Sequence, residues 1–356
     1  MLDQIPAVPA GETYASPEMP GIVRHRPEFD GRAGEYFGIW FVNLILSILT
    51  LGIYSAWAKV RTERYFYGNT RIAGASFEYL AEPIAILKGR LIAYAVVIAL
   101  GLSSKFAPLL YSLLILAVFS VMPILVVMGL RFRARYSAWR GVRFRFAERL
   151  GAGYGPFLGW PLLNAVTLTA VYPLVKRRQQ EFVVEGHRFG RELFGFHGQA
   201  GRYYAVYGVG LLLLFGVMIG AGLALSGAFS WAGETAAAFE FLAGFYLALF
   251  PVLVYLHVRY VNLMWNNTSL GAHRFESTLR VRDMLWLYFS NTIVIVCTIG
   301  LAVPWAMVRL ARYRADHFAL LATGSLDEFV AEAEGAYHAA GAELSDALDF
   351  GADFGL

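Results

Sequence analysis

Five stretches of this chain, each 23 residues or longer, contain no charged side chain. The stretches are 36–58, 106–130, 151–175, 203–233 and 284–308. About 20 apolar residues in a helix cross the hydrocarbon core of a bilayer, so each stretch is long enough to enter or cross a membrane. Two shorter runs, 91–104 and 241–257, are further candidate spans, the first if Lys88 and Arg90 extend to the interface. The pattern predicts an integral membrane protein and argues against a large soluble enzyme.

Composition and cysteine content support this prediction. Charged residues make up 16% of the chain, whereas about 25% is typical of soluble domains. The opening residues are Pro-rich and lack a basic region followed by an apolar run, which argues against a cleaved signal peptide. The single cysteine, Cys297, excludes a disulfide framework or a CxxC metal site within the chain.

The two ends of the chain differ from the part between them. We predict a disordered N-terminal tail at 1–28, a multi-pass membrane domain at 29–322 and an acidic, partly helical C-terminal tail at 323–356. Residues 326–356 hold eight acidic residues and no Lys or Arg, so a net charge of +4 for the whole chain leaves +12 on residues 1–325. A helix at 326–348 would place Phe329, Ala333 and Tyr337 on one stripe outside the membrane.

Three of the apolar stretches contain a matching motif. The motif reads Thr50-Leu-Gly52, Thr167-Leu-Thr169 and Thr298-Ile-Gly300, and an arginine follows each Thr after eleven residues. Glycine and proline residues near the motif weaken or kink a helix. Asn43 and Asn291 each precede their Thr by seven residues. The motif therefore marks a predicted break inside each of these three blocks.

Short extended motifs separate the apolar blocks. Gly74-Ala-Ser-Phe77, Gly141-Val-Arg-Phe144 and Gly186-His-Arg-Phe189 share one spacing, and residues 142–146 alternate apolar and basic side chains with the period of a strand. Residues 29–37 and 196–204 form another matching pair, each just before an apolar block. We predict an all-α integral membrane fold, multi-pass with internal repeats, with short extended segments on the cytoplasmic face.

Three motifs resemble those of a known family. Phe-Asp-Gly-Arg-Ala-Gly-Glu-Tyr-Phe-Gly-Ile-Trp at 29–40, Leu-Thr-Leu-Gly-Ile-Tyr-Ser-Ala-Trp-Ala-Lys-Val-Arg at 49–61 and Tyr-Gly-Asn-Thr-Arg at 67–71 are similar to the YjgN-like family of bacterial inner-membrane proteins. The resemblance covers about residues 25–322. It implies a multi-pass protein of the bacterial inner (cytoplasmic) membrane with no assigned biochemical role, and it supplies no catalytic residues.

Two topologies are open for the three short blocks. If all seven apolar helices cross once, 29 of the 30 Lys and Arg residues divide into 16 on one side and 13 on the other, against the positive-inside rule. If the three short blocks re-enter and turn at the Thr motifs, all 29 share one face and only Lys105 is opposite. Re-entrant backbone needs shielding from lipid. We favour the re-entrant model.

Candidate polar positions at membrane depth are few. Asparagine or threonine inside a span either joins helices or lines a pathway, and for threonine we expect a bond to the preceding turn. The candidates are Asn43, Thr50, Asn164, Thr167, Asn291 and Thr298.

A basic and aromatic segment at 131–146 suggests a second kind of site. Beside a span, such residues typically contact anionic headgroups, so we predict anionic membrane lipids as partners and no nucleic acid. The candidate headgroup contacts are Arg131, Arg133, Arg135, Arg143 and Arg145.

No catalytic or cofactor motif is recognisable. His187 and His197, with Glu185 and Glu192, lack a zinc-ligand spacing. We therefore predict no enzyme activity, no cofactor and no metal. A transporter or channel, whose small-molecule substrate the sequence leaves unknown, ranks slightly above a structural, lipid-organising protein, because breaks and buried polar residues resemble discontinuous transport helices.

Overall fold

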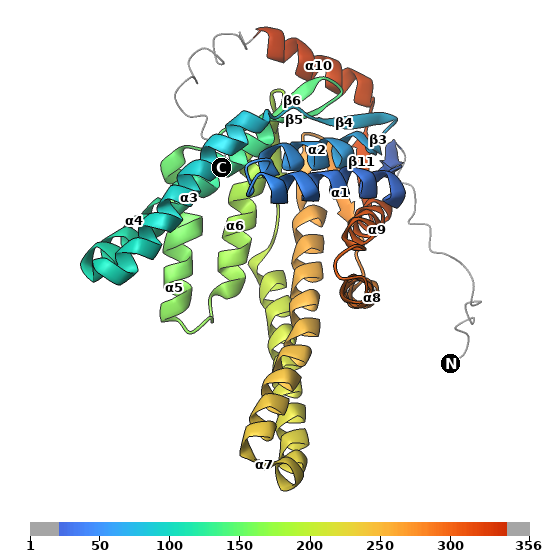
Figure 1. Cartoon of the computed structure of the whole chain (residues 1–356). Helices are drawn as coiled ribbons and strands as arrows, with labels where there is room; N and C mark the ends of the chain where they lie inside the picture. Colours follow the sequence, from blue (N-terminus) through green and yellow to red (C-terminus); the bar gives the residue numbers. More distant parts are fainter. Residues whose placement is uncertain (1–20, 340–356) are drawn as a thin grey trace, which may run out of the picture.

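The computed structural model describes residues 21–339, with side chains except at 221, 223–244, 247, 248, 332 and 334–339. Within this part, helices alternate with short strands (Figure 1). The helices are α1 (Ala33–Leu49), α2 (Ser55–Gly68), α3 (Pro83–Phe106), α4 (Pro108–Arg135), η1 (Leu150–Gly153), η2 (Gly155–Gly159), α5 (Trp160–Val166), α6 (Tyr172–Gly186), α7 (Ala200–Asn266), α8 (Val281–Cys297), α9 (Val303–Asp316) and α10 (Leu326–Ala339). The strands are β1 (Ile22–His25), β2 (Glu28–Phe29), β3 (Thr70–Ile72), β4 (Ala75–Tyr79), β5 (Ser137–Trp139), β6 (Val142–Phe146), β7 (His187–Phe189), β8 (Glu192–Phe196), β9 (Thr268–Leu270), β10 (His273–Ser277) and β11 (Phe318–Thr323).

The predicted all-α fold is confirmed only in part: the described chain is mostly helical, but the extended motifs join into one antiparallel sheet. Its eleven strands follow the order β1-β11-β10-β9-β8-β7-β6-β5-β4-β3-β2. The two edge strands, β1 and β2, are separated in the chain only by Arg26 and Pro27. Three peptide steps span at most about 11 Å, so the sheet must curl until its edges meet. Strands of two to six residues are stable here because each finds a partner from another part of the chain.

Two-residue turns connect the strands of four hairpins. In the first two turns both residues have positive φ, namely Ala73 (50°) with Gly74 (77°) and Arg140 (49°) with Gly141 (79°), which is the pattern of a type I′ turn. Gly190 and Gly271 begin the other two turns, also at positive φ. The sequence match of Gly186 with Gly74 and Gly141 is therefore misaligned, since Gly186 ends α6 and the glycine of the β7–β8 turn is Gly190.

Aromatic side chains line one face of the curled sheet. Phe77, Phe144, Phe194 and Phe275 occupy the middle positions of β4, β6, β8 and β10, and the rings of Phe194 and Phe275 stack with centroids 6.0 Å apart. Helix α10 covers this face: Phe329 stacks on Phe189 at 5.8 Å.

The contact of α10 with the sheet is close and apolar. A Cβ added to Gly190 would lie 2.6 Å from the Cβ of Ala333. The predicted helix at 326–348 is thus present over its described part, and Phe329 and Ala333 of its stripe pack on the sheet rather than facing solvent.

The same hydrogen bond recurs at five helix–strand junctions. At each junction a side chain at the start of a strand, or for His317 just before it, bonds the backbone carbonyl four residues earlier, in the last turn of the helix. The pairs are Thr70 with Phe66, Ser137 with Arg133, His187 with Val183, Thr268 with Met264 and His317 with Tyr313. Because each bond occupies a carbonyl that the helix end leaves free, it ends the helix and sets the start of the strand.

Within the described residues, the helices form five pairs that leave the sheet and return to it (Figure 1). The three short blocks become α1–α2, η1–η2–α5 with α6, and α8–α9, each reversing at its Thr motif. Helix α7 also folds back, because Tyr203 and Tyr260 near its two ends stack at 5.5 Å, whereas a straight helix of 67 residues would extend about 100 Å. The first and last pairs meet where the Tyr36 hydroxyl lies 3.5 Å from Met307 Sδ.

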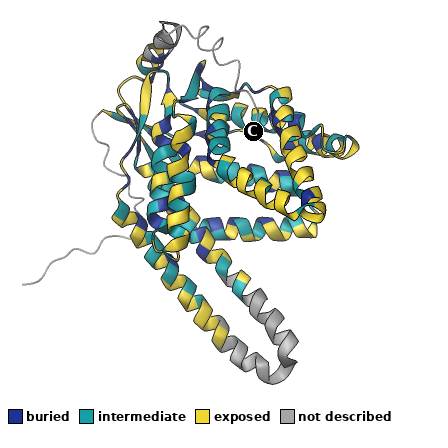
Figure 2. Ribbon diagram, turned by 90° about the vertical axis from the view of Figure 1, so that its left-hand side faces the viewer, coloured by how far each residue is buried: buried dark blue, intermediate teal, exposed yellow. Residues whose placement is uncertain are grey.

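Three of these helices are long and apolar enough to cross a membrane, among the residues described: α3, α4 and the Ala200–Gly220 part of α7. In Figure 2, much of the ribbon of the projecting helices is coloured as exposed. Of the predicted tails, residues 1–20 and 340–356 lie outside the described residues, while residues 22–25 form β1.

Candidate membrane-contacting surfaces and a polar pocket

The turns of the three short helix pairs expose large apolar side chains. Leu51 is 94% exposed, Leu168 87% and Ile299 93%, and all three have positive φ. Turns that face water are typically built from Gly, Asn, Asp, Ser or Pro. Exposed leucine and isoleucine at a strained backbone position indicate instead that these turns face an apolar environment.

The backbone amides of the Thr50 and Thr298 turns are satisfied within the turn. The Thr50 hydroxyl donates to the Leu46 carbonyl at 2.7 Å and accepts from the Tyr54 amide at 2.9 Å. Thr298 makes the same two bonds, to Val294 O at 2.7 Å and from the Ala302 amide at 3.1 Å.

The glycine of each motif and the third threonine complete this pattern. The Gly52 and Gly300 amides donate to carbonyls of the preceding turn, at 2.7 and 2.8 Å. Thr167 donates to Leu163 O at 2.9 Å. Backbone whose donors are satisfied without water is what a hydrocarbon environment requires.

Asn43 and Asn291 bond across their own helix pairs. The Asn43 amide nitrogen lies 3.4 Å from the Ala58 carbonyl, and that of Asn291 lies 3.5 Å from the Ala306 carbonyl. The Asn291 oxygen also accepts from the Arg309 guanidinium at 2.9 Å, whereas the buried Asn43 oxygen has no partner among the described residues. Asn164 Oδ1 likewise is buried without a described partner.

This difference predicts unequal effects of the same substitution. Asn291→Leu should lower the free energy of unfolding by about 1.5–3 kcal/mol, because it removes a charge-assisted hydrogen bond to Arg309. Asn43→Leu should change it by less than about 1 kcal/mol, because it removes a weak bond and an unpaired buried oxygen together. Thermal unfolding of the two variants in the same detergent measures the difference, and equal losses would contradict it.

Basic residues gather where the helices approach the sheet. The lysines and arginines of α2 to α9 that lie within about ten residues of a helix–strand junction are called the basic belt. They are Lys59, Arg61, Arg64, Lys88, Arg90, Arg131, Arg133, Arg135, Lys176, Arg177, Arg178, Arg202, Arg259, Arg282, Arg309, Arg312 and Arg314. Among the described helices, Lys105 is the one basic residue at an end away from the sheet. The belt therefore marks one level of the molecule.

The five predicted headgroup arginines do not form a single patch. Arg131 donates to the Glu148 carbonyl at 2.6 Å, and Arg133 is exposed beside α2. Arg135, at the end of α4, belongs to the belt. Arg143 and Arg145 alternate with Phe144 along β6, so they lie on the outer face of the curled sheet.

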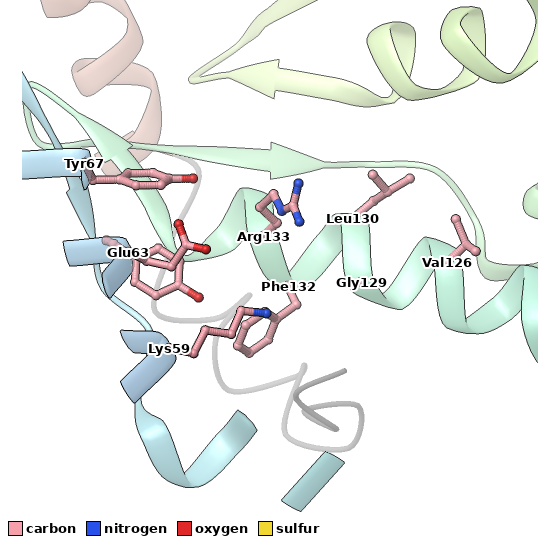
Figure 3. A pocket seen from close by; sticks show the side chains of 9 residues that line it. Lys59, Glu63, Tyr67, Val126, Gly129, Leu130, Phe132 and Arg133 are labelled. Atoms are coloured by element: carbon pink, nitrogen blue, oxygen red, sulfur yellow. The ribbon is translucent and has the colours of Figure 1, made fainter. Parts of the chain in front are cut away.

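A pocket of about 430 Å³ lies between α2 and α4 (Figure 3). Lys59, Glu63 and Tyr67 line it from α2, at the helical spacing that places them on one stripe. Helix α4 contributes a facing stripe, and Tyr79 of β4 closes the sheet end. The α4 residues are Val126, Gly129, Leu130, Phe132 and Arg133.

The sequence motifs did not predict this pocket, although the charge pattern carries one signal for it. Lys59 is the first charged residue after the apolar stretch 36–58, and Arg131 is the first after 106–130. The charged parts of α2 and α4 thus begin at the same level of the molecule. This becomes apparent only once β4 and β5 pair and bring the two helices together.

Comparison with known proteins agrees with a membrane assignment. Residues 24–347 match the family described as "Bacterial protein of unknown function (DUF898)". The chain belongs to this family. It is 25% identical to the inner membrane protein YjgN of Salmonella typhimurium over 345 residues, which covers 82% of this chain and 87% of the relative. A shorter match, 30% over 149 residues, relates 42% of the chain to 37% of YjgN of Escherichia coli O157:H7. No solved structure matches the chain.

The resemblance to YjgN-like proteins is therefore confirmed, and this DUF898 family member is a protein of the bacterial inner membrane. Among the residues described, no group of three His, Cys, Asp or Glu side chains is placed to hold a metal ion. His187 bonds Val183 O, and burial lowers its pKa. His197 lies 3.1 Å from the Ser269 hydroxyl.

Proposed function

We propose that this protein is a lipid-binding membrane scaffold. Its helix pairs enter the inner membrane from the cytoplasmic face, and the basic belt contacts anionic headgroups of the cytoplasmic leaflet. The observation that carries the proposal is the turn geometry: exposed apolar side chains lie at turns whose backbone amides bond within the turn at Thr50 and Thr298.

The basic belt supports the orientation. Juxtamembrane lysines and arginines concentrate on the cytoplasmic side of bacterial membrane proteins, and anionic lipids attract them there. Within the described helices, acidic residues at the same level are fewer than the basic ones. They are Glu35, Glu63, Glu181, Glu185, Asp283 and Asp316.

The geometry favours lipid binding over transport, in reverse of the order that the sequence alone suggested. A transport pathway near Asn43 and Asn291 needs these side chains to face water, yet both are buried and bond within their own helix pairs. The absence of enzyme activity and of nucleic-acid binding stays a prediction.

We further propose that a helix pair followed by paired strands is an internal repeat. The five equivalent junction bonds support it, as do Tyr36 and Tyr203, which are fully buried at the same position of residues 29–37 and 196–204. A second set of bonds agrees: the amides of Asp30 and His197 both donate to the asparagine that ends a later helix, at 3.0 and 2.8 Å.

Lipid selectivity tests the proposed function. Replacing three exposed belt residues, Lys88, Arg202 and Arg314, with Gln should lower the preference for phosphatidylglycerol over phosphatidylcholine by about tenfold or more, since each contributes about 1 kcal/mol near an anionic surface. The full chain is placed in nanodiscs that contain both lipids, and the lipids that stay bound to it are counted by native mass spectrometry.

A matched triple variant provides the control. Arg188, Arg191 and Arg274 are equally exposed but lie on the strands and their turns, so their change to Gln removes the same charge away from the membrane level. Equal effects of the two triple variants would contradict a headgroup role for the belt. Solute flux through proteoliposomes that contain the protein would favour the transport hypothesis instead.

A further inference from the structure

The pocket between α2 and α4 combines separate charges of both signs. Figure 3 shows Lys59 and Glu63 from α2 facing Arg133 and Leu130 from α4 across one space. Within the described residues, Glu63 makes no ion pair with Lys59 or Arg133, although all three line the same pocket. A ligand that carries both charges could pair with all of them at once.

The polar side of the pocket offers Tyr79 and Arg133 as hydrogen-bond donors. Burial, together with the nearby Glu63 carboxylate, raises the pKa of Tyr79 to about 12, so this phenol stays protonated at neutral pH. The Tyr67 hydroxyl lies 3.1 Å from Ser137 Oγ and fixes the neighbouring wall. Protonated phenols and a guanidinium are good donors to phosphate oxygens.

The α4 wall is apolar and leaves room. Val126 and Leu130 belong to the charge-free stretch 106–130, and Gly129 between them has no side chain to fill the space. A glycine inside a helix costs about 1 kcal/mol relative to alanine. Gly129 nevertheless lines the pocket, whose volume of about 430 Å³ is within the range of small-molecule sites.

We propose that this pocket binds a zwitterion made of a phosphodiester and a primary ammonium, as in the headgroup of phosphatidylethanolamine. Lys59 and Arg133 bind the phosphate, Glu63 accepts hydrogen bonds from the ammonium, and the α4 wall contacts the start of the acyl chains. This assignment rests on the proposed function, because it places the pocket at the headgroup level.

Glu63 separates this ligand from other phospholipids. Phosphatidylglycerol would leave the carboxylate without a cationic partner in a half-buried site, which is unfavourable. A quaternary ammonium has no N–H to donate to Glu63. The pocket should therefore prefer a primary ammonium, whereas the basic belt prefers anionic lipids, so the two sites differ in the lipid that they select.

Lipid competition on the full chain tests the assignment. The purified protein is delipidated in detergent and given equal amounts of phosphatidylethanolamine, phosphatidylcholine and phosphatidylglycerol, and bound lipid is identified by native mass spectrometry. We expect one tightly held phosphatidylethanolamine. Glu63→Gln should reduce its preference over phosphatidylcholine by about tenfold or more, the effect of one charge-assisted hydrogen bond. Arg133→Gln and Gly129→Leu should abolish tight binding of any phospholipid.

Controls distinguish a loss of lipid binding in the pocket from a loss of folding and from a change in lipid binding at the basic belt. Glu78→Gln and Arg191→Gln remove exposed charges outside the pocket and should leave the bound lipid unchanged. Only variants whose thermal unfolding matches wild type are compared, and Glu63→Gln preserves side-chain shape. Soluble glycerophosphoethanolamine forms a second arm: displacement of the lipid at equal concentration would assign the site to a free solute.

The outcomes are distinct. No preference for either ethanolamine compound, or a preference that Glu63→Gln does not reduce, overturns the assignment. The proposed function would still stand in that case if phosphatidylglycerol selectivity is lost in the triple variant at Lys88, Arg202 and Arg314 and kept in its matched control. If that triple variant keeps its phosphatidylglycerol selectivity while the pocket still binds phosphatidylethanolamine, only the headgroup role of the basic belt is contradicted.

Discussion

Single cysteines at Glu78, Arg191 and Ala272, in a Cys297→Ala background, will react with a membrane-impermeant maleimide from one side of the membrane only. The three positions are exposed and belong to β4, the β7–β8 turn and the β9–β10 turn of one sheet. A single sheet cannot lie on both sides of a bilayer. We therefore expect complete labelling from the cytoplasmic side and none from the periplasmic side, measured on oriented membrane vesicles.

The alternative topology makes the opposite prediction. If all seven apolar helices crossed once, Arg191 and Ala272 would lie on the side opposite Glu78. Lys105→Cys provides the reference for the far side, because Lys105 lies at the end of α3 away from the sheet and is exposed. Labelling of Glu78→Cys and Arg191→Cys from different sides would contradict the sheet itself.

Leu51→Asp and Ile299→Asp should each lower the free energy of unfolding in bicelles by about 2.5–3.5 kcal/mol, the cost of a charge near the centre of a membrane helix. Both side chains are more than nine-tenths exposed at the turns of their helix pairs. In water, the same changes would be neutral or favourable, because aspartate adopts positive φ more readily than leucine or isoleucine. The sign of the effect therefore reports the environment of the turn. Denaturation by SDS titration measures it.

A glycine variant separates backbone from environment. Leu51 has a φ of 49°, and Leu51→Gly relieves this strain without adding a charge, so it should stay within about 1 kcal/mol of wild type. If Leu51→Asp is as stable as Leu51→Gly, the turn faces water and the insertion of the helix pairs is contradicted.

The predicted helix breaks agree well with the structure. The Thr-x-Gly motifs place the turns of α1–α2 and α8–α9, and Thr167-Leu-Thr169 places that of α5–α6. These signals are local: a threonine that bonds the preceding turn and a residue at positive φ reverse the chain within five residues. The candidate Thr positions thus support turns, while their part in any site stays untested.

The sheet was not predictable in the same way. Its strands are mostly three to five residues long, too short for periodicity to identify them reliably, and their partners lie far apart in the chain. Ile22 pairs with Thr323, and Phe77 with Trp139. The match of Gly186 with Gly74 shows the limit of predicting strands from motif spacing. Equal spacing grouped Gly186, which ends a helix, with Gly74 and Gly141, which lie in turns.

The sequence by itself determined that the chain enters a membrane, where its helices break and which family it belongs to, because these depend on charge-free length, local turn chemistry and similarity. Only the tertiary structure decided that the extended motifs form one curled sheet, since pairing across up to 300 residues leaves no local trace. It also decided which charges meet. Lys59, Glu63 and Arg133 share a pocket because β4 and β5 pair and bring α2 beside α4.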